Sequence, residues 1–211
     1  MTLHPDDRGL PAAARANAFY ALSRCFDQPL RWPADLASFL RTAFDPLGAA
    51  AAGAASRLAA AIDAATDRDA LAAAHARLFV GPLRLDAPPW ASAYLEPDGQ
   101  LMGAASTYAR RAYLDAGLDT TTRVEAPDHV AFELEFMYYL AYREAETADA
   151  TWFDRQVRFW REHLGAWLPR LLAFVRVGAG GAAVYAALAE LGSACAARFD
   201  AVYAPAEGAR R

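Results

Sequence analysis

The sequence predicts an all-α fold, a single-domain helical bundle, and three observations support this class. The chain of 211 residues contains 54 alanines, the residue with the highest intrinsic helix propensity, and few β-branched residues. Apolar residues recur at spacings of three and four along most of the chain, which is the period of an amphipathic helix. Hydrophobic residues make up 55% of the chain, and a domain of this length buries a core without disulfide or metal staples.

The apolar period and the helix-breaking residues together place the elements in order. Thr66 or Asp67 is expected to cap one helix, Gly117 to end another, and Pro127 with Asp128 to start the next. Pro169 is expected to kink the helix that contains it. We expect one domain over residues 1–204 and a disordered tail over 205–211. The predicted helices cover residues 11–26, 35–44, 49–65, 69–79, 106–116, 127–146, 152–176 and 184–202.

Composition and charge exclude several classes of function. The formal charge is −4, all 21 basic residues are arginines, and no segment concentrates them, so we expect no nucleic-acid partner. The first residues lack the basic and apolar parts of a secretory signal, and no long apolar window predicts a membrane span. Cys25 and Cys195 belong to no CxxC motif and are expected to be reduced and buried. These features predict a cytoplasmic protein without stable membrane insertion.

A loop between residues 80 and 105 is the first candidate for a functional site. Its prolines and glycines forbid a long helix, and loops of this length in a compact helical domain are usually functional or disordered. Trp90, Tyr94, Leu101 and Met102 argue against disorder, because that much apolar surface normally packs against something. The loop is therefore predicted to be ordered and to take part in binding.

The second candidate is the acidic and apolar segment 125–137. It contains Glu125, Asp128, Glu133 and Glu135 with phenylalanines and a methionine between them. Taken alone, such a helix is more often a solvated face backed by core residues. Beside an aromatic loop it is also suited to a peptide groove, because carboxylates bind arginine and aromatic residues provide an apolar floor.

Motifs for catalysis, metals and phosphate are incomplete. His129 and Glu133 share a helix face but make only half of a metal site, and a surface pair is the simpler interpretation. We therefore predict neither a metal nor another cofactor. The absence of lysine excludes Schiff-base chemistry. One enzymatic alternative remains, a helical hydrolase or lyase that uses Asp128 and His129 as acid and base, but the chain is not expected to be an enzyme.

Several segments taken together resemble the redox-enzyme maturation chaperones, the TorD-like family that serves TMAO, DMSO and nitrate reductases. The similarity covers most of the chain from residue 77 to about residue 172, in order and at the family's spacing. The matching segments are Leu78-Phe79-Val80-Gly81-Pro82, Ala87-Pro88-Pro89-Trp90-Ala91-Ser92-Ala93-Tyr94-Leu95, Glu125-Ala126-Pro127-Asp128-His129 and Glu133-Leu134-Glu135-Phe136-Met137.

The resemblance implies an all-helical chaperone, without catalysis, for a molybdenum-cofactor oxidoreductase. It would bind the N-terminal twin-arginine leader of that enzyme and hold it until cofactor insertion and export. The alternative within the family is an assembly chaperone for a cytoplasm-facing nitrate reductase subunit. The chain would act as a monomer or a homodimer. The peptide-binding residues implied by the matching motifs are Trp90, Ser92, Tyr94, Glu125, Pro127, Asp128 and His129.

A physical hypothesis divides the work among these residues. A leader has an arginine pair followed by an apolar segment, so it needs carboxylates next to an apolar cleft. We expect Asp128 and Glu125 to contribute electrostatically and Trp90 and Tyr94 to contribute by burial. His129 could make the site sensitive to pH, although a capping role is an equally good interpretation.

Overall fold

The computed structural model describes residues 9–81, 85–118 and 125–205, and over these residues the predicted all-α class is confirmed. The described part of the chain contains no strand. A single isolated bridge pairs Trp90 with His129. The tail expected over 205–211, and the polar connector that the sequence predicts over 119–125, fall almost wholly outside the described residues.

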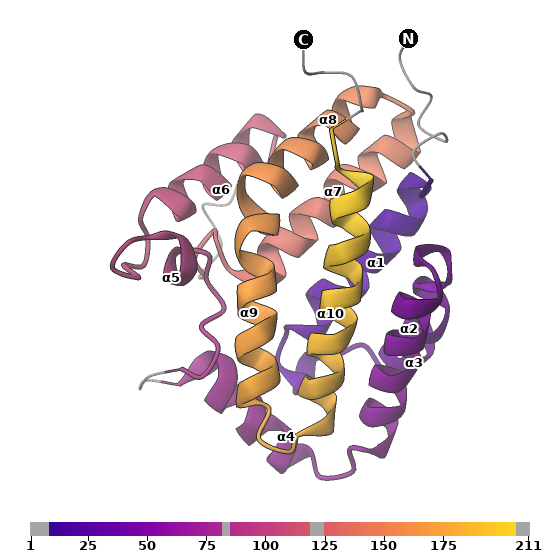
Figure 1. Ribbon diagram of the computed structural model, residues 1–211, viewed down its shortest axis with the longest axis vertical. Coiled ribbons are helices and arrows are strands. Elements are labelled where there is room, and N and C mark those ends of the chain that lie inside the picture. Colours follow the sequence, from indigo (N-terminus) through magenta and orange to yellow (C-terminus); the bar gives the residue numbers. More distant parts are fainter. Residues whose placement is uncertain (1–8, 82–84, 119–124, 206–211) are drawn as a thin grey trace.

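Two groups of helices form the centre of the bundle (Figure 1). Helix α1 (Ala12–Cys25) packs along α7 (Val130–Thr147), which is the most extensive contact between two helices. Helix α10 (Ala183–Val202) lies between α3 (Ala49–Ala64) and α9 (Gly165–Gly178) and contacts both. The long helices therefore enclose one continuous core.

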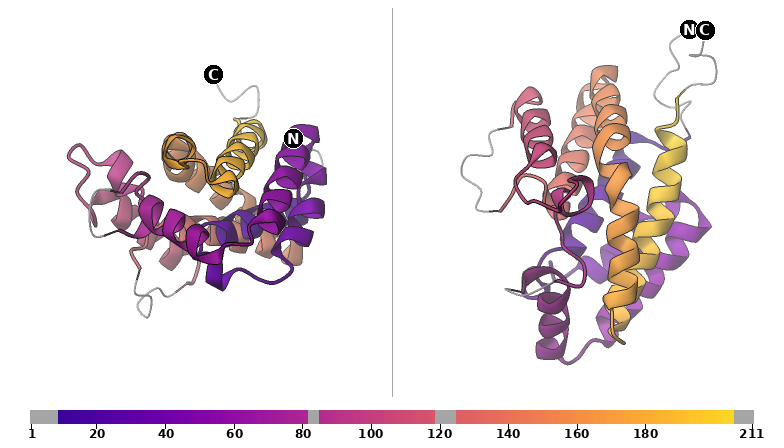
Figure 2. Two further views of the ribbon diagram at one scale, coloured as in Figure 1. Left: turned by 90° about the horizontal axis from the view of Figure 1, so that it is seen from below. Right: turned by 60° about the vertical axis from the view of Figure 1, so that its left-hand side comes forward.

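The shorter helices cover the edges of this centre. Figure 2 shows α6 (Ala104–Asp115) and the single turn of α5 (Ser92–Leu95) on one side of α9, with α10 and α3 on the other. Helix α2 (Leu36–Ala43) packs on α3, and α8 (Ala150–Phe159) packs on α7. Helix α4 (Arg68–His75) lies at the end of the bundle where α9 and α10 meet (Figure 1).

Several helix ends agree with the signals in the sequence. The Asp67 carboxylate caps α4 by accepting a hydrogen bond from the Ala70 amide, as predicted. Gly117 follows α6 with φ +82°, a conformation that glycine adopts without the Cβ clash of other residues. Asp149 caps α8 through the amide of Thr151.

Two predicted helices differ from the structure in the same way. The helix expected over 152–176 is interrupted by a π-helical turn at Trp160–Leu164, whereas Pro169 lies inside α9 one turn later. The helix expected over 69–79 ends as an α-helix at His75 and continues as a π-helical turn, Ala76–Val80. Apolar periodicity over one turn does not distinguish an α-turn from a wider π-turn, because residues four apart lie on the same face in both.

The core is rich in aromatic side chains where α1, α10 and the Trp160 turn meet. Phe19 stacks on Phe199 with ring centroids 4.2 Å apart, and Trp160 meets Phe199 edge-on at 5.4 Å. Cys25 and Cys195 are free and buried, as predicted. Burial raises the pKa of the Cys25 thiol to about 12, so this thiol stays protonated and unreactive.

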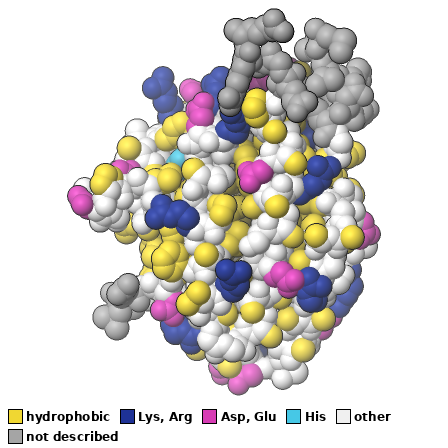
Figure 3. All heavy atoms as spheres, in the orientation of Figure 1, with side chains coloured by type: hydrophobic (Ala, Val, Ile, Leu, Met, Phe, Trp, Pro, Cys, Tyr) yellow, Lys and Arg dark blue, Asp and Glu magenta, His cyan; other side chains and the backbone are white. Residues whose placement is uncertain are grey.

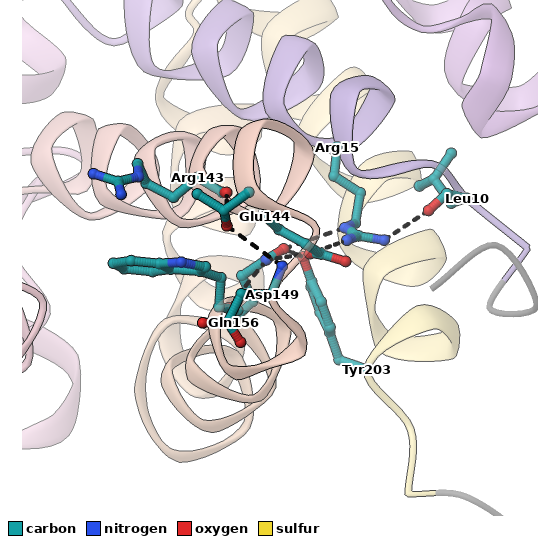
Figure 4. A network of polar contacts seen from close by, with 9 residues as sticks. Leu10, Arg15, Arg143, Glu144, Asp149, Gln156 and Tyr203 are labelled. Carbon is teal, nitrogen blue, oxygen red and sulfur yellow. Dashed lines mark hydrogen bonds and ion pairs between the residues drawn. The ribbon is translucent and has the colours of Figure 1, made fainter. Parts of the chain in front are cut away.

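A buried polar network joins four parts of the chain at the end of α7 (Figure 4). The Arg15 guanidinium forms an ion pair with Glu144 and donates to the carbonyl of Leu10. Gln156 donates to Glu144 at 2.7 Å and accepts from Arg15 and from the Tyr203 hydroxyl. The Arg15 and Glu144 side chains are 0% and 2% exposed, so each depends on the other for its charge compensation.

Candidate functional site

A groove of about 680 Å³ lies between α5, α9 and the loop before α5. In Figure 3 hydrophobic side chains gather between α5 and α9, next to basic side chains. Phe174 and Leu101 are 50% and 48% exposed, so two large apolar side chains of the groove are open to solvent. The lining residues that matter below are Asp86, Trp90, Tyr94, Leu101, Arg170 and Phe174.

The loop that forms one wall of the groove is fixed to the start of α7 by its backbone. The amide of Ala91 donates to the carbonyl of Asp128 at 3.0 Å, and the amide of Val130 donates to Pro89 at 2.8 Å. These bonds form the bridge between Trp90 and His129, whose rings meet edge-on at 6.2 Å. The described part of the loop and the Asp-His motif therefore form one unit. This part of the loop is ordered, as predicted.

Asp128 is buried and holds this unit together. It is 0% exposed, and its carboxylate accepts from the Ser92 amide at 2.9 Å and from the Ser106 hydroxyl at 2.5 Å. It thereby satisfies the amide that begins α5 and ties that turn to α6. Asp128 was expected at the start of α7, but the residue that caps α7 is His129.

His129 caps α7 with its ring. Its Nδ1 accepts a hydrogen bond from the Ala131 amide at 3.2 Å, which requires an unprotonated nitrogen. Burial lowers the pKa of His129 to about 4, Asp128 acts against this shift, and His75 adds to it. At neutral pH the ring is therefore uncharged.

Behind the groove, Glu133 of α7 is buried between two side-chain nitrogen atoms, one from the π-turn Trp160–Leu164 and one from α9. Its Oε1 lies 2.6 Å from His163 Nε2, and its Oε2 accepts from Trp167 Nε1 at 2.9 Å. Burial raises the pKa of Glu133, and both contacts act against this shift. The sequence-based interpretation of His129 and Glu133 as a surface pair is wrong, because Glu133 is 0% exposed and its hydrogen bonds are to other residues.

Tyr94 connects this buried cluster to the groove. Its ring stacks on Trp167 with centroids 5.5 Å apart, and its hydroxyl is buried without a hydrogen-bond partner among the described residues. Arg170, one turn after Trp167, donates to the Tyr94 carbonyl and lies 5.5 Å above the Tyr94 ring. Glu133, Trp167, Tyr94 and Arg170 thus form a chain of contacts from the core to the surface.

The predicted site residues take different positions relative to the groove. Trp90 and Tyr94 line it, while Ser92 and Asp128 are fully buried behind it. Pro127 is half-buried, and its carbonyl accepts from the Tyr113 hydroxyl at 2.7 Å. Glu125 is exposed and precedes this unit in the chain. The expected neighbourhood therefore forms, but most of its members support the groove wall.

Sequence reasoning missed the wall contributed by α9. Arg170 and Phe174 are exposed, whereas Trp167 and Leu171 of the same helix are buried, and no residue of this helix was predicted from the sequence to be part of a site. Their spacing of four places both on one outer face. A large aromatic residue on an otherwise outward-facing stripe was the available signal for an exposed binding surface.

The contacts of Asp128 and His129 bear on the enzymatic alternative. Asp128 and His129 bind different backbone and hydroxyl partners, so the geometry gives no support to the hydrolase alternative. Across residues 9–81, 85–118 and 125–205, no group of three or more His, Cys, Asp or Glu side chains is placed to hold a metal ion. No helix in those ranges is long and apolar enough to cross a membrane.

Comparison with known proteins adds a family to this geometry. The family model of the nitrate reductase delta subunit matches residues 44–173, which include the lining residues of the groove except Phe174. A crystal structure from Archaeoglobus fulgidus, described as a "putative redox enzyme maturation protein", has a TM-score of 0.45 and 24% sequence identity. The similarity covers 75% of this chain and 90% of that one. No curated protein matches the chain.

The class of protein is therefore that of the redox-enzyme maturation chaperones, as the resemblance in the sequence indicated. Because the match covers more than half of its length, the chain belongs to the nitrate reductase delta subunit family.

Proposed function

We propose that the chain binds the N-terminal leader of a molybdenum-cofactor oxidoreductase in the cytoplasm and holds it until cofactor insertion and export. The observation that carries the proposal is the apolar groove between α5 and α9. Its volume falls in the range of about 300–1,000 Å³ that is typical of ligand-binding pockets. Family membership makes a molybdoenzyme subunit the expected partner, and the chaperone would act as a monomer or a homodimer.

The seven residues named from the sequence divide into contact and support in this proposal. Trp90 and Tyr94 face the peptide, and Glu125 offers an exposed carboxylate to an arginine pair. Ser92, Pro127, Asp128 and His129 hold the wall in place through the bonds described above. A buried Asp128 can act on the peptide only indirectly, because both of its oxygens already accept hydrogen bonds.

A peptide titration tests the proposal. The probe is a synthetic peptide with an arginine pair followed by a segment of leucine and alanine, titrated by calorimetry into the full chain. Trp90→Ala should weaken binding at least tenfold, because buried tryptophans dominate binding energies. Trp32→Ala is the matched control, since Trp32 is also half-buried but lies near α2, away from the groove. If wild-type protein binds no such peptide, peptide binding is wrong.

The nitrate reductase alternative is favoured by the description of the matching family. In that case the client segment has no exported leader and need not contain an arginine pair. A second peptide with both arginines replaced by glutamine separates the cases. Equal affinity of the two peptides supports the alternative, whereas a loss that is larger at low salt supports a twin-arginine leader.

A further inference from the structure

The polar groups within the groove are mainly hydrogen-bond donors. Arg170 and Tyr94 both line the groove: Arg170 presents a guanidinium, and behind the Tyr94 ring the hydroxyl is buried without a partner among the described residues. Burial raises the pKa of Tyr94, so the phenol keeps its proton. The Asp86 carboxylate, also in the lining, is already 3.4 Å from the guanidinium of Arg77. An occupant that offers oxygen acceptors is therefore better matched to this part of the groove than one that offers donors.

Arg170 and Tyr94 are positioned by the buried cluster behind them. Tyr94 stacks on Trp167, whose indole nitrogen donates to Glu133, and the Tyr94 carbonyl accepts from Arg170. Arg170 itself is exposed and lies over the Tyr94 ring. The Tyr94 hydroxyl is itself buried, so an acceptor reaches it only when neighbouring side chains such as Arg170 move.

We infer that Arg170 and the Tyr94 hydroxyl determine the specificity of the groove by donating hydrogen bonds to main-chain carbonyls of the bound peptide's apolar segment. The inference rests on the proposed function. Apolar side chains carry no acceptor, so main-chain carbonyls are the only oxygens that this segment offers. Such carbonyls are free in an extended segment or in the last turn of a helix. The positive charge of Arg170 also disfavours placing the leader's arginine pair here.

The first test removes the hydroxyl alone. Tyr94→Phe should lower the affinity for the peptide with the leucine–alanine segment about tenfold, which is the effect of one lost hydrogen bond in a buried site. Tyr185→Phe is a matched control, because the Tyr185 hydroxyl is also buried without a partner among the described residues. Its ring lies against His75, and Tyr185 does not line the groove. Neither substitution should lower the melting temperature, since each removes an unpaired buried group.

The second test removes the charge of Arg170. Arg170→Gln should lower the affinity for the same peptide several-fold. Arg176 is another exposed arginine on the same helix, and Arg176→Gln should leave the affinity unchanged. The loss caused by Tyr94→Phe should persist with the peptide whose arginine pair is replaced by glutamine. It should disappear with a peptide whose apolar segment is replaced by glycine and serine.

The outcomes separate the two proposals. If wild type binds the peptide and Tyr94→Phe binds it equally well, the inferred role of the hydroxyl is wrong and leader binding stands. If the Tyr94→Phe effect vanishes when the arginine pair is removed, the groove binds the arginines and the inference is also wrong. If no peptide binds wild type, the proposed function fails, and the inference fails with it.

Discussion

Helix α7 carries two buried glutamates, Glu133 near its start and Glu144 near its end, and their surroundings differ. Glu144 pairs with Arg15, whose charge is permanent, and with the amide of Gln156. Glu133 contacts a histidine and an indole, neither of which needs to be charged. Both carboxylates are almost without solvent contact, so the difference lies in the partners.

The comparison shows two ways of burying a carboxylate for two purposes. The ionic network joins α1, α7, α8 and the end of α10. Removing the charge of Arg15 or of Glu144 leaves the other charge buried without a partner. Substitution of Glu133 leaves no permanently charged side chain without a partner. The cluster around Glu133 also positions Trp167 and Tyr94 behind the groove. The first arrangement stabilises the fold, and the second supports the binding surface.

The largest expected effect on stability is at Glu144, near the end of α7. Glu144→Gln leaves Arg15 buried without a counter-charge and should lower the free energy of unfolding by about 3–5 kcal/mol, measured by urea denaturation. Asp63→Asn is the control, because Asp63 pairs with Arg41 at the surface, where both side chains are about half exposed. If Glu144→Gln lowers the free energy of unfolding no more than Asp63→Asn does, the buried ion pair does not stabilise the fold as inferred.

The start of α7 should be the end that responds to acid. Burial lowers the pKa of His129 to about 4 from an unfolded value of 6.5, so the unfolded chain binds the proton more readily. Stability from this histidine is present above pH 6.5 and is lost as the pH falls toward 4, by about 2 kcal/mol. His75, also shifted to about 4, should add to the loss.

His129→Asn separates the two histidines. Asparagine caps a helix without titrating in this range, so the variant should lose less stability than wild type between pH 6.5 and pH 4.5. The measurement is urea denaturation at each pH. Parallel curves for the variant and wild type would show that the capping ring does not titrate as inferred.

A smaller effect is expected for Glu133→Gln. The amide can still accept from Trp167, and no permanent charge is stranded, so the cost should be about 1–2 kcal/mol. Peptide affinity should fall several-fold as well, because Trp167 supports Tyr94. The corresponding change at the other end, Glu144→Gln, should leave the affinity of the folded protein unchanged. Loss of affinity in both variants would mean that general stability, and not position, controls binding.

The smallest effect is expected for Asp128→Asn. Asparagine can accept from the Ser92 amide and donate to the Ser106 hydroxyl, so stability should change by less than about 1 kcal/mol. Peptide affinity and its salt dependence should also stay close to those of wild type. A steep loss of affinity at low salt that disappears at high salt would instead place the Asp128 charge in direct contact with the arginine pair.

Most of the fold could be predicted from local signals. The predicted 11–26 and 49–65 helices match α1 and α3, and Asp67 and Gly117 act at helix ends as expected. These signals act within a few residues and need no knowledge of the rest of the chain. The two π-turns were missed because residues four apart lie on the same face in an α-turn and in a π-turn, so the apolar spacing fits both.

The candidate site was predicted only in part. The loop around Trp90 and the Asp-His motif lie together as the resemblance implied, whereas the charge expected to face a peptide at Asp128 is buried. An aspartate in a short motif looks the same whether it meets a ligand or a backbone amide. The partners that decide this, Ser92 and Ser106, are distant in sequence and come near only in the folded chain.

By itself the sequence determined the class of fold, the position of most helices and the family, because periodicity, caps and ordered motifs are properties of the chain as written. Only the tertiary structure decided which carboxylates are buried, that α9 supplies Arg170 and Phe174 to the groove, and that Glu133 and Glu144 have different partners. The physical reason is that burial and hydrogen bonding depend on contacts between distant segments, which no local pattern specifies.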